Sequence, residues 1–164
     1  RGDAAGGRPP AAFLRLNASP GLILAGGPVA ELVGGIPRDI VFEVTEHESI
    51  ADYAALRAAL VGLRPDVRLA VDDAGAGVAN FQHLVGLRPQ YIKVDAGLVR
   101  GVDGDPSRQA LIVALLHFAG ATGAEVIAEG IETDAELAVL RRLGVGLGQG
   151  YLLARPAPAA TFRG

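Results

Sequence analysis

Polar side chains able to bind a metal ion or move a proton follow most of the short apolar runs in this chain. They are Asn17, Glu43, Asp72 with Asp73, Lys93 with Asp95, Glu129 and Gln149. Carboxylates gathered in one place repel one another, because like charges a few Å apart cannot all stay ionised. A divalent cation offsets that repulsion, so these residue types predict a metal site if the side chains meet in one pocket.

The kind of donor indicates which metal would bind. The sequence has no cysteine, and none of its 3 histidines ends a predicted strand, so every candidate ligand offers oxygen. Oxygen donors favour Mg²⁺, Mn²⁺ or Ca²⁺ over zinc. The adjacent Asp72 and Asp73 could serve two ions, one activating water and one steadying the leaving oxygen in a displacement at phosphorus. The pattern therefore points to hydrolysis of a phosphoester.

Two of these residues have distinct candidate roles in such chemistry. A lysine at the mouth of an acidic pocket, as Lys93 would be, can orient the attacking water or neutralise charge that develops on phosphate. Glu129 is the natural candidate for the general base. Gly130 after it permits a tight turn, and Glu132 lies near the start of the next helix, where negative charge is favourable. Glu132 is therefore also open to a structural role.

Short runs rich in apolar and β-branched residues predict the strands that would position these side chains. We predict strands at residues 13–16, 40–44, 67–71, 91–94 and 125–128, and a weaker one at 145–153. Apolar residues at helical spacing predict helices over 50–63, 107–121 and 134–143, the last opening with Thr133 and Glu136 in capping-box register. Alternating strands and helices imply parallel βα units.

Such units could build an open doubly wound sheet or most of an eight-stranded barrel. No glycine-rich phosphate loop follows the first predicted strand, which weakens the open sheet as a nucleotide-binding fold. The polar residues at the strand ends favour the barrel, because all strands of a barrel open their carboxyl ends on one face. We expect an α/β fold of the TIM-like barrel type, incomplete, with about six strands present and the first strands missing.

Composition narrows the possible partners and location. The net charge is -3, with acidic and basic residues interspersed, so polymeric nucleic acid is not an expected partner. No apolar stretch reaches the roughly 20 residues that span a bilayer, so no membrane segment is expected and cytoplasm is the predicted location. Residues 1–12 are predicted to be a flexible lead-in and residues 13–164 one domain. The sequence begins without methionine, which is compatible with a piece of a longer protein that carries flanking sensory domains.

Five ordered motifs resemble those of the bacterial EAL domain. Residues 42–46 (FEVTE) are similar to its ExTE segment, 72–77 (DDAGAG) to its DDFGTG loop and 92–95 (IKVD) to KxD. Residues 126–133 (VIAEGIET) are similar to the AEGVET segment, and Gln149-Gly150-Tyr151 with Pro156 to QGYxxxxP. A short match at 16–19 (LNAS) adds Asn17. Together these motifs cover nearly the whole chain.

The resemblance implies a barrel that hydrolyses cyclic di-GMP to linear pGpG with Mg²⁺ or Mn²⁺, as two ions, and with Ca²⁺ as an inhibitory ion. It implies that Asn17, Glu43, Asp72, Asp73 and Glu129 bind metal, that Glu129 and Lys93 are catalytic, and that Gln149 contacts the substrate. Glu46 and Glu132 would support the loop after Asp73, and Asp95 would lie in the same outer layer. A homodimer is implied as well.

Two departures from the family pattern bear on activity. The glutamate of the Glu-x-Leu signature should lie well before Asn17, and only 16 residues precede Asn17 here, so one metal ligand is absent from the sequence. In the loop after Asp73, Ala74, Ala76 and Val78 replace the usual phenylalanine, threonine and tyrosine. For these 164 residues alone we expect weak or no turnover.

Three functions are compatible with these motifs to different degrees. The first is a cyclic di-GMP phosphodiesterase domain. The second is a degenerate EAL-like domain that senses the dinucleotide or docks a protein. The third is an unrelated metal-assisted barrel enzyme, which would require the five motifs to coincide by chance.

His47, His83 and His117 are expected to be structural or surface residues, and Tyr91, Phe81 and Phe118 to belong to the core.

Overall fold

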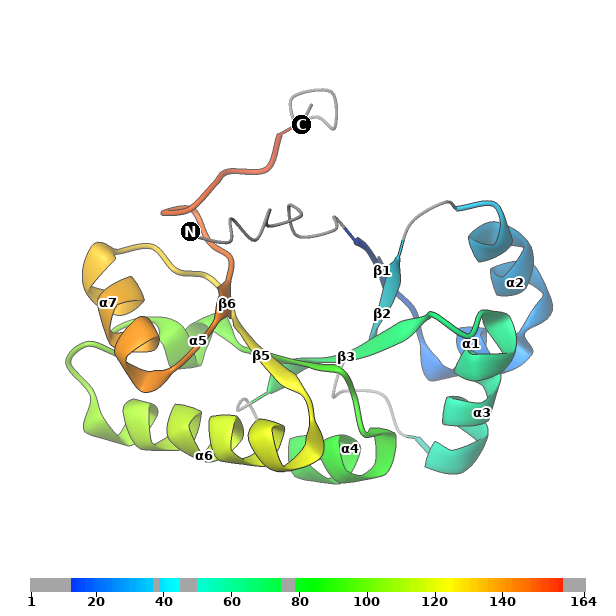
Figure 1. The fold of residues 1–164 in the computed structure, drawn as a ribbon, viewed down its shortest axis with the longest axis horizontal. Helices are drawn as coiled ribbons and strands as arrows, with labels where there is room; N and C mark the ends of the chain where they lie inside the picture. The colour runs from blue at the N-terminus through cyan, green and yellow to red at the C-terminus, as the bar shows by residue number, and fades with distance from the viewer. Residues whose placement is uncertain (1–12, 37–38, 45–49, 75–78, 158–164) are drawn as a thin grey trace, which may run out of the picture.

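A curled sheet of parallel strands forms the centre of the molecule. The computed structural model describes residues 13–36, 39–44, 50–74 and 79–157. In these ranges six parallel strands pair in chain order. They are β1 (Leu14–Asn17), β2 (Ile40–Val44), β3 (Arg68–Ala74), β4 (Tyr91–Val94), β5 (Glu125–Ala128) and β6 (Leu147–Gly148). Figure 1 shows the sheet bent into an open half-barrel, with β1 and β6 at its two edges.

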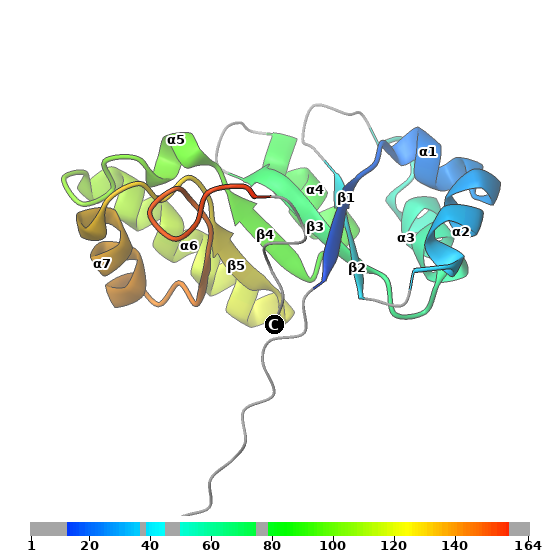
Figure 2. The same cartoon turned by 90° about the horizontal axis from the view of Figure 1, so that it is seen from above.

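The helices lie outside the curve of the sheet. They are α1 (Pro20–Ala25), α2 (Gly27–Gly34), α3 (Tyr53–Leu63), α4 (Ala79–Leu87), α5 (Ala96–Val99), α6 (Pro106–Thr122) and α7 (Asp134–Leu143). In Figure 2, α1, α2 and α3 flank the end of the sheet formed by β1 and β2, and α5, α6 and α7 flank the other end. None of these helices therefore covers the concave side of the half-barrel.

Alternation along the strands separates the two faces of the sheet. Phe42, Val71 and Ile92 point to the helices and belong to the main core, in which they are at most 2% exposed. Their strand neighbours Val41 and Tyr91 belong to a second, smaller apolar cluster on the opposite, concave face. Because successive side chains of a strand alternate between faces, the residues two positions further along, Glu43 and Lys93 among them, also face the concave side.

The predicted fold class is confirmed, and the sequential strand order excludes the doubly wound alternative. The five stronger strand predictions each overlap an observed strand within a few residues. The weaker one, at 145–153, is mostly wrong, since only Leu147 and Gly148 pair in the sheet. After them the chain turns back, and the backbone of Ile131 forms hydrogen bonds with Gln149 O and Leu152 N.

The three predicted helices are also confirmed, with one shifted start. The first begins at Tyr53 rather than near residue 50, because the side chain of Asp52 accepts the N–H groups of Ala54 and Ala55 and fixes the first turn. The capping box of Thr133 and Glu136 is present as predicted. Phe81 was wrongly predicted to be core, since it is 45% exposed on α4.

Some expectations fall outside the described ranges. The lead-in at 1–12, Glu46, His47 and the loop residues Ala76 and Val78 are among them. None of the described helices combines the length and the apolar character that crossing a bilayer requires.

Candidate active site

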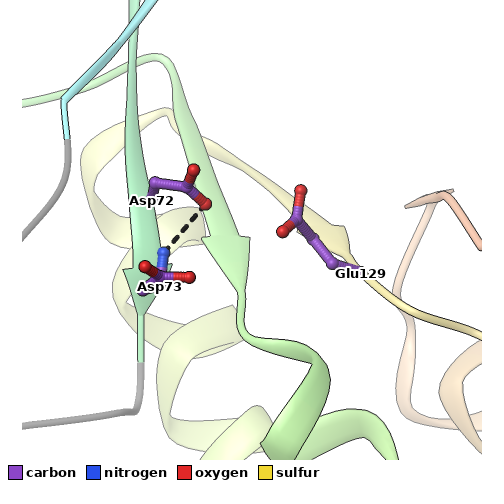
Figure 3. Close-up of side chains that lie close together, drawn as sticks. All are labelled: Asp72, Asp73 and Glu129. Atoms are coloured by element: carbon purple, nitrogen blue, oxygen red, sulfur yellow. Dashed lines mark hydrogen bonds between the residues drawn. The ribbon is translucent and has the colours of Figure 1, made fainter. Parts of the chain in front are cut away.

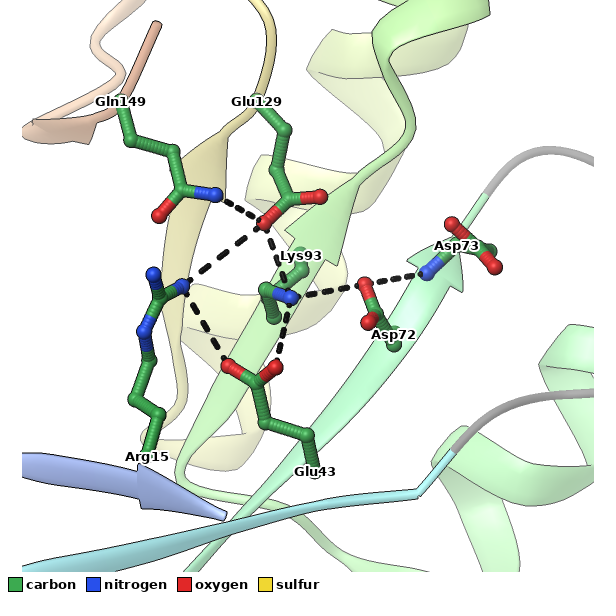
Figure 4. Close-up of polar contacts among 7 residues, drawn as sticks. All are labelled: Arg15, Glu43, Asp72, Asp73, Lys93, Glu129 and Gln149. Atoms are coloured by element: carbon green, nitrogen blue, oxygen red, sulfur yellow. Dashed lines mark hydrogen bonds and ion pairs between the residues drawn. The ribbon is translucent and has the colours of Figure 1, made fainter. Parts of the chain in front are cut away.

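Polar side chains from four strands, β1 to β4, and from the segments after β5 and β6 converge on the concave side of the sheet. Figure 4 shows them as one network, formed by Arg15, Glu43, Asp72, Asp73, Lys93, Glu129 and Gln149. Six of these seven were predicted from the sequence. They lie at the carboxyl ends of the strands, which is the face that carries the active site in barrel enzymes.

Lys93 is the centre of this network. Its Nζ atom lies 2.9 Å from Glu43 Oε2, 2.9 Å from Asp72 Oδ1 and 2.9 Å from Glu129 Oε1. The side chain is only 4% exposed. Burial acts to lower the pKa of Lys93, but the three carboxylates outweigh burial and raise the pKa above its ordinary value. Lys93 is therefore a fixed positive charge, and it is the only lysine in the sequence.

Glu129 follows β5 and shares one carboxylate oxygen among several donors. Oε1 accepts a hydrogen bond of 2.6 Å from Gln149 Nε2 in addition to the contact with Lys93. Burial raises the pKa of Glu129, and the Lys93 ammonium offsets only part of this effect. A carboxyl whose pKa is raised toward neutrality is better suited to accept and release a proton than an ordinary surface glutamate.

Asp72 and Asp73 lie where the ladder between β3 and β4 is irregular. The register shifts between Val71 and Ala74, so the strand bulges at the two aspartates. Asp73 has φ of 58°, a left-handed conformation that non-glycine residues rarely adopt, and its N–H donates to Asp72 Oδ1 over 2.9 Å. Bulges and such conformations gather at functional sites because they redirect side chains.

The bulge brings Asp72 and Asp73 near Glu129. One carboxylate oxygen from each of the three residues lies within 4.8 Å of the others. Figure 3 shows the three side chains, from β3 and from the segment after β5. This donor set fits a hard divalent cation, because it consists of oxygen atoms that carry more negative charge than Lys93 alone offsets. Asp72, Asp73 and Glu129 are thus the residues best placed to hold the predicted metal.

Glu43 and Asn17 were predicted as ligands but lie outside this group of three. Glu43 is buried, and its two oxygens face Lys93 and Arg15. Asn17 is exposed at the end of β1 and lies beside Glu43 in the register of the β1–β2 ladder. The two residues therefore form a second group of oxygen donors at the β1 edge of the site.

Three residues, Asp95, Glu132 and Glu46, were predicted to support the site, and the structure places the first two. Asp95 caps α5 by accepting the N–H of Gly97. Glu132 forms an ion pair of 2.9 Å with Arg100. Glu46 lies outside the described residues.

Sequence reasoning missed Arg15 at the site, and it predicted Glu136 nearby only as a helix cap. Arg15 lies 3.3 Å from Glu43 and 3.9 Å from Glu129, and the signal for it was its position two residues before Asn17 on the same strand face. The buried Glu136 accepts the backbone N–H groups of Gly101, Glu132 and Thr133. The capping-box pattern was its only signal in the sequence.

A cavity of about 460 Å³ opens beside the network. Its lining includes Arg15, Arg100, Gln149, Tyr151 and Arg155. The guanidinium of Arg155 lies over the ring of Tyr151, 4.8 Å from its centre. The cavity therefore joins the carboxylate network to a wall that combines positive charge with an aromatic surface.

Of the three histidines, the two in the described ranges lie away from this site. His83 is buried on α4, with its Nδ1 atom 3.0 Å from the hydroxyl of Tyr53. His117 is exposed on α6. Both positions agree with the structural or surface role that was predicted.

The fold and the site define a TIM-like barrel protein with a polar centre at the carboxyl ends of its strands. The chain belongs to the EAL domain family, whose model matches residues 10–156. The EAL domain of Mycobacterium smegmatis DcpA is similar in structure, with a TM-score of 0.79 and 31% identity over 91% of this chain and 70% of that one.

Two further proteins that are similar to this chain have names that state a function or a ligand. The cyclic di-GMP phosphodiesterase RocR of Pseudomonas aeruginosa is 35% identical over 77% of this chain and 32% of its own length. The manganese and cyclic di-GMP complex of Klebsiella pneumoniae BlrP1 is 35% identical, with a TM-score of 0.76 over 88% of this chain and 39% of that one. The chain spans between 17% and 32% of the length of the first curated relatives that it matches.

Proposed function

We propose that this chain is the catalytic part of a cyclic di-GMP phosphodiesterase domain that forms linear pGpG with the help of Mg²⁺ or Mn²⁺. The observation that carries the proposal is the cluster of Asp72, Asp73 and Glu129, two of which contact the buried Lys93, in a member of the EAL domain family. The names of RocR and of the BlrP1 complex support the choice of substrate and of ion.

In this proposal Asp72, Asp73 and Glu129 would hold one ion, and Glu43 and Asn17 would be available for a second one. When bound, the metal supplies Lewis-acid activation of water and charge stabilisation at phosphorus. Glu129 is placed to accept the proton that the attacking water would give up, because it lies beside the other carboxylates of the site. Gln149 fixes the orientation of Glu129 through its 2.6 Å hydrogen bond.

Lys93 has two roles in this reaction. Before substrate binds, it offsets the negative charge of Glu43, Asp72 and Glu129. During the reaction its fixed charge stabilises the negative charge that develops on the phosphate oxygens, and this stabilisation requires no rearrangement because the side chain is already held on three sides.

The test is to mix the chain with cyclic di-GMP in Mn²⁺ buffer and to follow binding by calorimetry and pGpG by chromatography. The Glu-x-Leu glutamate is absent from the sequence, so the expected turnover of these 164 residues is slow. We expect binding in both the wild type and Glu129→Ala, and product only in the wild type. Nucleotide binding without any product from the wild type would support the alternative of a sensor domain. If the wild type gives no binding and no product, the proposal is wrong.

The cytoplasmic location and the homodimer also remain proposals. An exposed apolar surface on α4, formed by Phe81 and Val85, supports association with a second copy, because such surface is costly to leave in water. Light scattering of the purified chain tests this, and a monomer at all concentrations would contradict the homodimer.

A further inference from the structure

The guanidinium of Arg15 joins two candidate metal ligands that belong to different strands. Its Nη1 atom lies 3.3 Å from Glu43 Oε1, on β2, and 3.9 Å from Glu129 Oε1, after β5. Figure 4 shows the side chain reaching from β1 to the space between the two carboxylates. The positive charge of Arg15 therefore lies between the carboxylate oxygens of Glu43 and Glu129.

Both carboxylate oxygens of Glu43 already face a cation of the protein, which affects whether Glu43 can bind a metal ion. Its Oε2 atom is held by Lys93 over 2.9 Å. Its Oε1 atom is buried and receives no hydrogen bond from the described residues, so the neighbouring charge of Arg15 is what compensates it. A divalent ion that binds Glu43 through Oε1 therefore has to take the place of Arg15.

The charges of the network lead to the same conclusion. The four carboxylates of Glu43, Asp72, Asp73 and Glu129 are offset by two cations, Lys93 and Arg15. Among these six described residues the formal charge is then -2, which one divalent ion neutralises. A second ion would meet a site without excess negative charge and a guanidinium that repels it. Removing the charge of Arg15 makes the second position more favourable.

Lys93 and Arg15 differ in how easily each side chain can move away from the carboxylates. Lys93 is 4% exposed and contacts three carboxylates, so its departure would leave buried charges uncompensated. Arg15 is 39% exposed on the edge strand β1 and lines the 460 Å³ cavity. Its long side chain can turn into that cavity while the strand stays in place.

We propose that Arg15 is an internal counter-cation that limits the site to one divalent ion until its guanidinium turns away from Glu43. The inference rests on the proposed function, since it concerns the metal centre of that same site. The first ion binds Asp72, Asp73 and Glu129, and the second ion, at Glu43, binds only in competition with Arg15. An anionic phosphate in the cavity would draw Arg15 away and so admit the second ion together with the substrate.

The experiment counts bound Mn²⁺ without nucleotide, by calorimetry and by the electron paramagnetic resonance signal of free Mn²⁺. Wild type is expected to bind one ion, and Arg15→Gln to bind a second ion at least about tenfold more tightly than wild type does. Arg15→Lys keeps the charge and is expected to behave as wild type. Arg15→Met replaces Arg15→Gln if circular dichroism shows that the glutamine variant is unfolded.

Arg100→Gln is the matched control, because it removes one positive charge from the same cavity. Arg100 pairs with Glu132 rather than with Glu43 or Glu129, so its loss is expected to leave the number of bound ions unchanged. Equal ion counts and affinities within about twofold for wild type and Arg15→Gln would overturn the inference about Arg15 alone. Two ions already bound by wild type would do the same.

The remaining outcomes separate this inference from the proposed function. If no variant binds Mn²⁺, both the inference and the metal-dependent function are wrong. If Arg15→Gln gains the second ion but cyclic di-GMP is neither bound nor cleaved, the inference stands and the proposed substrate is wrong.

Discussion

Asp72 and Lys93 lie on neighbouring strands, and Oδ1 of Asp72 is 2.9 Å from Nζ of Lys93. The same oxygen accepts the N–H of Asp73, so the lysine charge and the bulged backbone of β3 meet on one atom. The geometry of the acidic pair therefore depends on a cation supplied by the next strand. This coupling of charge and backbone makes Lys93 a stabilising residue as well as a candidate catalytic one.

Replacing Lys93 with methionine is expected to destabilise the fold by about 3–5 kcal/mol in the absence of metal. The substitution leaves three buried or half-buried carboxylates without their shared cation, and breaking a buried ion pair in this way costs about that much. Mn²⁺ should restore more stability to Lys93→Met than to wild type, because the ion takes over part of the compensation. Urea unfolding with and without Mn²⁺ measures both effects.

Arg142→Met serves as the control for that substitution. Arg142 is exposed on α7, and the loss of a surface charge changes stability by less than about 0.5 kcal/mol. A similar cost for the two variants would show that the network around Lys93 is not stabilising.

Lys93 should remain charged beyond the ordinary range of a lysine. Its folded pKa is raised above the ordinary value of 10.5, so its charge stabilises the fold fully below that value. The stabilisation is lost as the pH rises through the raised folded pKa. Because Lys93 is the only lysine, a lysine-selective ¹³C label gives one side-chain signal, and its titration by NMR reports this pKa directly. A midpoint below 10.5 in the folded protein would contradict the prediction.

Because the pKa of Glu136 is lowered in the folded protein, we expect the free energy of unfolding to fall at acidic pH. Burial acts to raise its pKa, but the N–H groups of Glu132, Gly101 and Thr133 outweigh burial and hold the pKa below the ordinary value of 4.5. The stabilisation is present above pH 4.5 and is lost as the pH falls through the lower folded pKa. Glu136→Gln should cost about 1.5–3 kcal/mol at pH 7, since hydrogen bonds to a charged acceptor are lost.

Unfolding of wild type and Glu136→Gln at about pH 7, 5.5 and 3.5 checks this expectation. The difference between the two proteins should be constant over the upper two pH values and smaller at the lowest one. A difference that grows on acidification would have the wrong sign. Asp134→Asn is the control in the same first turn of α7, because it removes an exposed carboxylate and should cost less than about 1 kcal/mol.

Two substitutions of Asp73 allow its effect on stability to be measured separately from its effect on metal binding. Both Asp73→Gly and Asp73→Ala remove the carboxylate, so both should weaken Mn²⁺ binding to a similar extent. They differ in the backbone, because a φ of 58° is accessible to glycine without cost and disfavoured for alanine by about 1 kcal/mol. We therefore expect Asp73→Gly to be the more stable of the two by that amount in urea unfolding, and equal stabilities would contradict the left-handed conformation.

Much of the fold follows from the sequence because parallel strands are buried on both faces. Runs such as residues 40–44 and 91–94 are apolar almost throughout, and the exceptions, Glu43 and Lys93, mark the concave face. Helices α1, α2, α4 and α5 were not predicted. Two of them, α1 and α5, have only 6 and 4 residues and cannot display a helical period. The turn after Gly148 was also missed, because long-range contacts with Ile131, and not local propensity, direct it.

The candidate site was predictable as a set of residues but not as a geometry. Strand ends bring the carboxylates to one face whatever the details of packing, which is why Asp72, Asp73, Lys93 and Glu129 could be predicted. The role of Arg15 depends on the reach of one side chain across the curved sheet, and an arginine on a strand is usually solvated. The left-handed conformation of Asp73 depends on the bulge, for which the sequence holds no clear signal.

Gly150 connects the last part of the fold to the site. A Cβ atom at this position would lie 2.2 Å from the backbone N and O atoms of Ile131, so any side chain forces the two segments apart. Gln149 is the neighbouring residue and holds Glu129. Gly150→Ala should therefore destabilise the fold by about 1–3 kcal/mol, as overpacking does, and should lower pGpG formation by more than the unfolded fraction accounts for.

Gly146→Ala is the matched control, because a Cβ atom there meets nothing within 4 Å, and it should leave both measurements unchanged. If Gly150→Ala unfolds like wild type and keeps its activity, the close approach to Ile131 is not what positions Gln149 against Glu129.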